Sequence, residues 1–133
     1  MIINKVLTAG VDADPVLLWT NPSPNSSIYN RTLTFETGFN GYLVEFKRRN
    51  TASDAPLLST GIMFVPFGSS RYSGFIYPSD YSTTSGSGGV STENREITAS
   101  DGALRFSAGY IGENYENPSV CIPLRIWGVN WTL

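Results

Sequence analysis

Apolar and polar residues alternate along most of this chain, in short runs that turn residues separate. Ser, Thr, Tyr, Phe and Val fill the runs, and 13 glycines and 8 prolines punctuate the chain. Helical periodicity is hard to find. Because alternation with a period of two is typical of strands that bury one face, the pattern predicts an all-β fold. We expect an antiparallel β-sandwich, jelly-roll-like, with about eight strands in a single domain over residues 1–133.

The segment around Asp101-Gly102 predicts the clearest hairpin. An Asp-Gly pair is the strongest signal for a two-residue turn. With the turn placed there, one face of the hairpin carries the apolar residues Ile97, Ala99, Leu104 and Phe106. The other face carries Glu96, Thr98, Arg105 and Ser107. A slip of one residue would bury Arg105, so the turn and the alternation select the same register.

A second hairpin is predicted to turn at Asn40-Gly41. Its pairing gives one credible apolar face, made of Leu33, Phe35, Thr37, Phe39, Tyr42, Val44, Phe46 and Arg48. The outer face, however, places Glu36 opposite Glu45, and like charges in cross-strand positions repel. Either the loop is longer than two residues, or a positive group lies nearby.

Further strands are expected over residues 16–20, 58–67, 71–77 and 120–131. The first of these is expected to be buried. Residues 21–27 (NPSPNSS) contain two prolines, which fix φ and push the residue before each into extended geometry. We therefore expect this segment to cross from one sheet to the other. Residues 77–94 are rich in Ser and Gly and predict a long mobile surface loop.

The composition excludes several classes of protein. The net charge is −2 with scattered charges, so the basic footprint of a nucleic-acid-binding protein is missing. The basic run at 47–49 more often marks a solvated strand edge. No apolar run approaches the ~18 residues of a membrane helix, and the start, MIINKVLTAG, does not resemble a signal peptide. The single cysteine, Cys121, predicts a buried free thiol and no intramolecular disulfide.

Histidine is absent from the sequence. This removes the commonest general base near neutral pH and the commonest transition-metal ligand. A Ser–His triad, a Cys–His nucleophile and a zinc centre are therefore excluded, and no cofactor is expected. A hydrolase that uses carboxylates alone remains open, as does a site for a hard cation.

Carboxylates are thus the only groups left for catalysis. Glu36 and Glu45, if they are neighbours, match the acid and nucleophile of a glycosidase, but two solvated glutamates are the common alternative. Asp12 and Asp14 offer oxygen ligands for calcium, yet they lack the regular loop spacing, which favours a plain turn. The glycines at 86–89 lack the lysine of a phosphate-binding loop.

The segment 119–133 (SVCIPLRIWGVNWTL) is more informative. In an extended conformation it places Val120, Ile122, Leu124 and Ile126 on one face, which predicts core. The opposite face carries Cys121, Pro123, Arg125, Trp127, Val129 and Trp131. Because Pro123 cannot donate to a ladder, it predicts a sheet edge or a bulge.

Arg125, Trp127 and Trp131 make that opposite face a candidate contact surface. Arginine and tryptophan together suit stacking on a sugar ring or packing on a neighbouring subunit. The alternative is that the face is covered by the chain's own N-terminus or by the long loop, since tryptophans are often buried. Three tyrosines flank the long loop and are candidate ligand contacts by position and residue type alone: Tyr72, Tyr77 and Tyr81.

Two stretches of the sequence carry a resemblance to a known family, whose members start with L-W-x-N-P-S-P and end with C-I-P-[hydrophobic]-x-I-[aromatic]-G. The start is matched by Leu18, Trp19, Asn21, Pro22, Ser23 and Pro24. The ending is matched by Cys121, Ile122, Pro123, Leu124, Ile126, Trp127 and Gly128. In these stretches the chain resembles small β-rich proteins encoded among tail and host-attachment genes of phages and prophages of Gram-positive gut bacteria.

The resemblance implies a structural or adhesion domain of the virion, made in the bacterial cytoplasm and placed on the phage tail or virion surface. Its expected partners are other virion proteins and a host cell-surface glycan. Such proteins are commonly trimeric, so we expect a homo-oligomer with a trimer favoured. Neither motif is catalytic, and we expect no enzyme activity and no metal. The alternatives are a cellular carbohydrate-binding module and a glycan hydrolase that uses Glu36 and Glu45.

Overall fold

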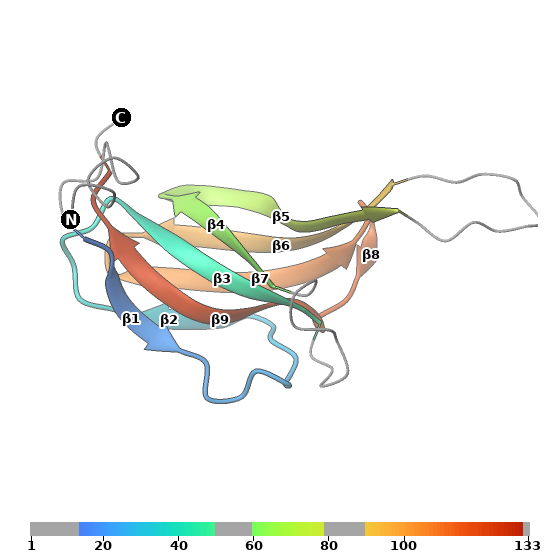
Figure 1. Ribbon diagram of the computed structural model, residues 1–133, viewed down its shortest axis with the longest axis horizontal. Coiled ribbons are helices and arrows are strands. Elements are labelled where there is room, and N and C mark those ends of the chain that lie inside the picture. Colours follow the sequence, from blue (N-terminus) through green and yellow to red (C-terminus); the bar gives the residue numbers. More distant parts are fainter. Residues whose placement is uncertain (1–13, 50–59, 79–89, 132–133) are drawn as a thin grey trace, which may run out of the picture.

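The computed structural model describes residues 14–49, 60–78 and 90–131. Within these ranges the chain forms nine strands and no helix, and therefore no helix that could cross a membrane. All of the strand pairs are antiparallel, and they build two sheets. Figure 1 shows the two sheets as layers that face each other. The predicted antiparallel β-sandwich is confirmed.

One layer has four strands in the order β1-β9-β3-β4. They span Val16–Thr20 (β1), Val120–Val129 (β9), Gly41–Arg49 (β3) and Thr60–Pro66 (β4). The other layer has the order β2-β7-β6-β5, with β8 paired to one end of β7. Its strands span Arg31–Thr34 (β2), Ala103–Ile111 (β7), Val90–Ser100 (β6), Gly68–Pro78 (β5) and Tyr115–Glu116 (β8). β1 thus pairs with β9 in one sheet and β2 with β7 in the other, so the chain passes from one layer to the other between β1 and β2 and returns between β2 and β3.

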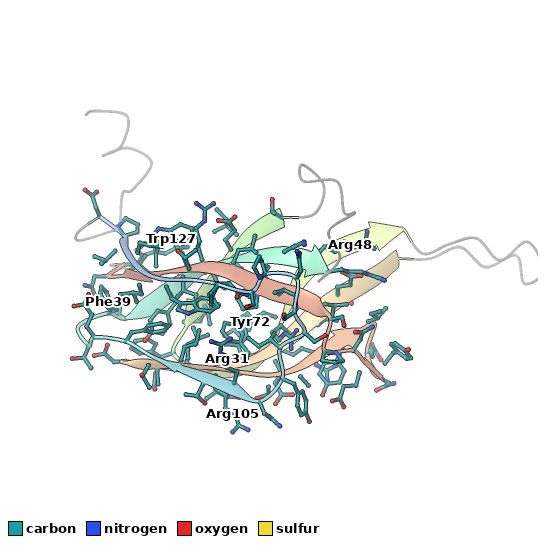
Figure 2. The ribbon with its side chains drawn as sticks, turned by 90° about the horizontal axis from the view of Figure 1, so that it is seen from below. Arg31, Phe39, Arg48, Tyr72, Arg105 and Trp127 are labelled. Carbon is teal, nitrogen blue, oxygen red and sulfur yellow. The ribbon has the colours of Figure 1, made fainter. Side chains whose placement is uncertain are left out.

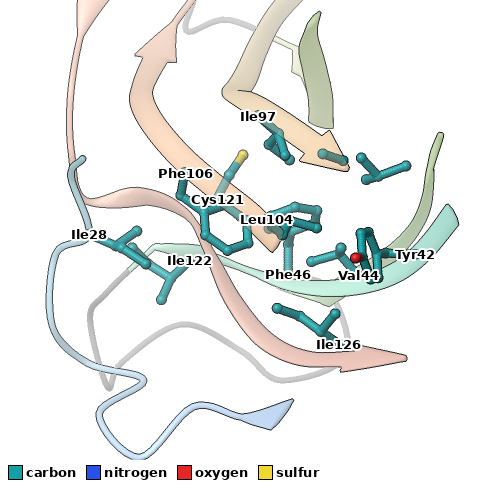
Figure 3. Close-up of a cluster of buried hydrophobic side chains, with 12 residues drawn as sticks. Ile28, Tyr42, Val44, Phe46, Ile97, Leu104, Phe106, Cys121, Ile122 and Ile126 are labelled. Atoms are coloured by element: carbon teal, nitrogen blue, oxygen red, sulfur yellow. The ribbon is translucent and has the colours of Figure 1, made fainter. Parts of the chain in front are cut away.

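The core lies between the sheets, and both contribute to it. Its buried members are Ile28, Tyr42, Val44, Phe46, Val65, Ile97, Ala99, Leu104, Phe106, Cys121, Ile122 and Ile126. Figure 3 shows these side chains gathered between the strands of the two layers. Phe46 and Phe106, one from each sheet, meet edge to face with 6.4 Å between ring centroids. Burying one such side chain stabilises a fold by about 1.5–3 kcal/mol, so this cluster holds the layers together.

The hairpin predicted at Asp101-Gly102 is confirmed. β6 and β7 pair in the expected register, and the four apolar residues of the inner face are buried: Ile97, Ala99, Leu104 and Phe106. Arg105 lies on the exposed face, as expected. The register shifts between Arg95 and Ile97, so the predicted pairing of Glu96 with Ser107 does not form.

The hairpin predicted at Asn40-Gly41 is wrong. β2 pairs with β7, in the other sheet, whereas β3 pairs with β9 and β4. Residues 35–40 cross between the two sheets instead. The Asp101 carboxylate fixes the crossing, because it accepts hydrogen bonds from the backbone N–H of Gly38 at 2.9 Å and of Phe39 at 3.2 Å. Gly38 has a φ of 111°, a conformation that favours glycine.

The inner face predicted for β3 is nevertheless correct. Three of its residues are buried as expected: Tyr42, Val44 and Phe46. Glu36 does not oppose Glu45, because the strand partners of Glu45 are Ile62 in β4 and Arg125 in β9. The positive group expected near Glu45 is therefore Arg125.

The other predicted strands are found close to their expected positions. β1 spans residues 16–20, but the prediction that it is buried is wrong, because it is an edge strand with one neighbour. The loop predicted over residues 77–94 is wrong at both ends. Tyr77-Pro78 belongs to β5 and residues 90–94 belong to β6, while 79–89 lie outside the described residues.

The faces predicted for the C-terminal strand are only partly correct. Val120, Ile122 and Ile126 are buried, as expected, but Leu124 is only half-buried. Cys121, expected on the opposite face, forms no disulfide and is buried in the core. Strict alternation fails here because the backbone leaves regular strand geometry, with a φ of 50° at Cys121.

A bulge in β9 explains the change of face. β9 pairs Arg125 with Glu45 but Pro123 with Phe46, so Leu124 is an extra residue on one strand. The bulge expected from Pro123 is therefore confirmed. The alternative, a sheet edge, is wrong because β9 lies between β1 and β3.

Candidate functional site

A row of side chains crosses the outer face of the four-stranded sheet. Strand pairing places four residues side by side over β1, β9, β3 and β4: Leu17, Trp127, Leu43 and Phe64. Cross-strand partners share one face of a sheet, and the next residue of β3, Val44, is buried in the core. These four residues, the outer row, therefore point away from the core.

β1 supplies Leu17 to the outer row through a shift in its register. Leu17 pairs with Trp127, but Trp19 pairs with Ile126, so β1 changes face between them. Trp19 packs against the core, where the guanidinium carbon of Arg31 lies 5.6 Å from its ring centroid. Leu17 is left 54% exposed on the outer face.

A second row lies next to the outer row on the same face. The same pairing aligns Thr20, Arg125, Glu45 and Ile62. Ile62 is 66% exposed, which is unusual for a large apolar side chain. We call the outer row together with Arg125, Glu45 and Ile62 the outer surface.

Arg125 and Glu45 form a double hydrogen-bonded ion pair within the outer surface. Arg125 Nε donates to Glu45 Oε2 at 2.8 Å, and Nη2 donates to Oε1 at 3.1 Å. The Arg125 side chain is 51% exposed and that of Glu45 only 12%. The guanidinium carbon also lies 5.6 Å from the ring centroid of Trp127, within the range of a cation–π contact. The ion pair thus holds the guanidinium beside the indole.

Trp131 lies at the rim of the outer surface, against Phe64. Their rings stack with 4.4 Å between centroids and 14° between planes. The Asn40 side chain holds the Trp131 backbone, since Oδ1 accepts from its N–H at 2.9 Å and Nδ2 donates to its carbonyl at 2.8 Å. Gly41 leaves room for the Phe64 ring, because a Cβ at Gly41 would lie 2.4 Å from it. One face of the Trp131 indole is therefore covered by its own chain.

The six predicted contact residues do not gather in one place. The structure brings three of them to the outer surface or its rim: Arg125, Trp127 and Trp131. Tyr72 packs against the core, and Figure 2 shows it between Trp127 and Arg105, which lie on opposite sides of the sandwich. Tyr77 belongs to β5, where only its backbone is described, and Tyr81 lies outside the described residues.

The carboxylates considered for catalysis are not paired by the sheet. Glu45 is bound by Arg125, whereas Glu36 is exposed on the crossing between the sheets. Asp12 and the glycines at 86–89 lie outside the described residues. In the part of the chain that the structure describes, no group of three or more His, Cys, Asp or Glu side chains could hold a metal ion.

The sequence predicted that the basic run at 47–49 marks a solvated strand edge, and this prediction is wrong. β3 lies between two neighbours, and Lys47 Nζ donates to Asn25 Oδ1 at 2.6 Å. Arg48 and Arg49 form ion pairs with Glu93 at 3.2 and 2.8 Å, and the Glu93 side chain is fully buried. Because a buried carboxylate needs positive partners, the two arginines stabilise the fold at this point.

Arg95 is a buried charged residue that the sequence pattern did not indicate. Its guanidinium donates to backbone carbonyls of four residues: Ile28, Pro118, Val120 and Cys121. Burial lowers the pKa of Arg95 to about 10, because desolvation disfavours the charged form. Because an arginine in a strand pattern is typical of an exposed position, no signal in the sequence indicated that Arg95 is buried. Arg95 joins two connecting segments to β9 and is not part of the outer surface.

Three members of the outer row were also missed: Leu17, Leu43 and Phe64. A signal for two of them was present in the sequence. Leu43 lies between Tyr42 and Val44, and Phe64 belongs to the apolar run 62–65, so β3 and β4 carry apolar residues on both faces. Strands of this kind are expected either deep inside a fold or at a contact surface.

Comparisons with protein families, with curated proteins and with solved structures give no match to this chain. The resemblance to phage tail and host-attachment proteins therefore stays a prediction. The two stretches that carry it do lie in contact, because β1 pairs with β9 and the Asn21 side chain bonds the Pro123 carbonyl.

Proposed function

We propose that the protein is a non-enzymatic structural or receptor-binding domain of a phage tail or virion surface. Its partners are other virion proteins and a host cell-surface glycan, and it works as a homo-oligomer, with a trimer favoured. The resemblance at residues 17–25 and 121–128 supports the viral setting. The outer surface supports a binding role.

The observation that carries this proposal is the place of Trp127 in the outer row. Its strand neighbours are Leu17 and Leu43, so the indole belongs to an apolar strip on the outside of the sheet. Exposed apolar patches with polar rims mark interaction sites. An aromatic ring buried in an interface contributes about 2 kcal/mol, and many copies on one particle convert weak contacts into firm attachment.

The test is co-sedimentation of the purified protein with intact Gram-positive bacteria and with phage particles that lack it. We expect the unmodified protein to bind and Trp127→Ala to lose most of the binding. Tyr29→Ala is the matched control, because Tyr29 is an exposed aromatic residue outside the outer surface. Absence of binding to both cells and particles would contradict the proposed function.

A cellular carbohydrate-binding module is the second candidate. It is favoured by the guanidinium carbon of Arg125 at 5.6 Å from the Trp127 ring centroid, a polar group beside an indole that suits a sugar ring. The module predicts a monomer that binds cell-wall oligosaccharides with millimolar affinity. Calorimetric titration with these sugars, together with the mass in solution, separates the two candidates.

A further inference from the structure

We infer that the outer surface binds a second copy of this chain. The inference rests on the proposed function and adds a two-fold contact between copies, separate from the contacts within the favoured trimer. The avidity that this contact provides strengthens attachment to the host glycan. It follows from the chemistry of the side chains, from the hydrogen bonds that they already make, and from the distribution of their charges.

Most of the outer surface has no group that could bind a polar ligand. Leu17, Leu43, Ile62 and Phe64 carry no polar side-chain atom. A sugar needs donors and acceptors around its hydroxyls, and a hydroxyl placed on an aliphatic surface without partners costs free energy. Aliphatic and aromatic side chains that lie next to one another resemble the core of a protein–protein interface instead.

The two charged groups of the outer surface already use their hydrogen bonds on each other. Arg125 donates twice to Glu45, through Nε and Nη2. An anionic ligand that took Arg125 would leave the 12% exposed Glu45 side chain without its cation and would meet a carboxylate of like charge. The surface is therefore poorly suited to acidic polymers and to nucleic acid.

The charges of the outer surface are complementary to themselves. Arg125 and Glu45 lie opposite each other on β9 and β3, the two inner strands of the sheet, and they sum to zero. Two copies that meet face to face about a two-fold axis can therefore place the Arg125 of one beside the Glu45 of the other. A surface with charges of one sign would repel its own copy.

The dimensions of the outer surface predict a weak contact. Four strands about 4.8 Å apart and two rows about 7 Å apart give a footprint of a few hundred Å² on each copy. This belongs to the class of transient interfaces, which bury less than about 1,200 Å² in total. We expect a dissociation constant on the order of 10–100 µM, which the many copies of a virion protein would strengthen by avidity.

Sedimentation equilibrium over about 5–500 µM protein tests the inference. The mass should rise from one chain to two or more as the concentration increases. Leu17→Ser removes an exposed apolar side chain of the outer row and should raise the dissociation constant at least about tenfold. Tyr115→Ser removes a 66% exposed ring from β8, which lies away from the outer surface. This control variant should leave the dissociation constant unchanged. Circular dichroism melting curves verify that both variants fold.

A mixing experiment tests the charge pairing directly. Arg125→Glu gives a surface with two acidic residues, and Glu45→Arg gives one with two basic residues. Neither variant should associate with itself, but the equimolar mixture should associate, because opposite charges then face each other across the contact. If these side chains act only within their own chain, the equimolar mixture will not associate either.

Three results would overturn the inference: a mass of one chain at about 500 µM, unchanged association of Leu17→Ser, or a mixture that stays monomeric. Binding to cells and particles is measured independently. A monomer that binds cells overturns the self-association and favours the carbohydrate-binding module over the oligomeric virion protein. A protein that self-associates but binds neither contradicts the proposed function and leaves the inference intact.

Discussion

The side-chain amide of Asn21 donates a 2.8 Å hydrogen bond to the backbone carbonyl of Pro123, across 102 positions of the sequence. The backbone N–H of Asn21 donates to the carbonyl of Leu124 at 2.7 Å. Both acceptors lie at the bulge of β9, where a ladder leaves carbonyls without strand partners. The two stretches that carry the predicted family resemblance therefore form one structural unit.

Asn21→Ala should lower the free energy of unfolding by about 1–2 kcal/mol. The change removes the donor to the Pro123 carbonyl and the acceptor that Ser23 N–H uses at 2.8 Å. Urea unfolding followed by tryptophan fluorescence measures the difference. Asn25→Ala is the control, because Asn25 is exposed and its side chain accepts a hydrogen bond from the Lys47 ammonium at the surface; its cost should stay within about 0.5 kcal/mol. Equal costs for both variants would contradict the role of Asn21.

Arg95→Met should destabilise the fold by about 3 kcal/mol or more. The variant removes a buried cation, but it leaves the carbonyls of Ile28, Pro118 and Val120 without their donor. Arg95→Lys keeps a positive charge with fewer donors and should have an intermediate effect. Chemical unfolding at neutral pH ranks the three proteins. A methionine variant as stable as the parent would show that the cost of burying the charge cancels its hydrogen bonds.

The phenol of Tyr42 predicts a loss of stability at alkaline pH. It is buried, donates to the Ser100 carbonyl at 2.6 Å and accepts from the Gly102 N–H at 3.1 Å. Burial raises the pKa of Tyr42 above 10.0, and the negative charge of Asp101 adds to the effect. Above pH 10 the unfolded chain loses this proton while the folded protein retains it, so the free energy of unfolding decreases as the pH rises.

Tyr42→Phe isolates this contribution. The variant should be less stable by about 1–2 kcal/mol at pH 8, because the Ser100 carbonyl and the Gly102 N–H lose a partner. As the pH rises above about 10, its free energy of unfolding should decline less steeply than that of the parent. Urea titrations at several pH values give both curves, and parallel curves would contradict the prediction.

Gly41→Ala should disturb the stacked rings at the rim of the outer surface. Its Cβ would lie 2.4 Å from the Phe64 ring, which must move away from Trp131. We expect a cost of about 1 kcal/mol and a shift in tryptophan emission. Phe64→Leu removes the stack without the clash and should cause a similar spectral shift. If Gly41→Ala keeps the parent's tryptophan emission and stability, the position of the Phe64 ring does not depend on the absence of a Cβ at residue 41.

Local signals predicted those parts of the fold in which neighbours in sequence are neighbours in space. Asp101-Gly102 and the alternation around it specify one register, and β6 and β7 adopt it. The Asn40-Gly41 turn failed for the opposite reason. β3 pairs with β9, far along the chain, and the Asp101 carboxylate binds the crossing at Gly38. No local pattern encodes these partners.

The outer surface was predictable only along a single strand. Arg125 and Trp127 were found because they alternate with the core residue Ile126. Leu17 and Phe64 come from other strands, whose lateral order the sequence does not reveal. The register shifts in β1 and β9 also change which face a residue occupies, and a shift of this kind is a property of the ladder and not of the residue types.

The position of β9 between β1 and β3 affects how the chain acquires its structure during translation. Ribosomes synthesise β1 and β3 early and β9 late, so the middle of the four-stranded sheet is the last part to be filled. Until then β1 has no partner and β3 is paired on one side only, and such open strand edges readily attach to other nascent chains. High expression should therefore favour inclusion bodies, and slower synthesis at low temperature should increase the soluble yield.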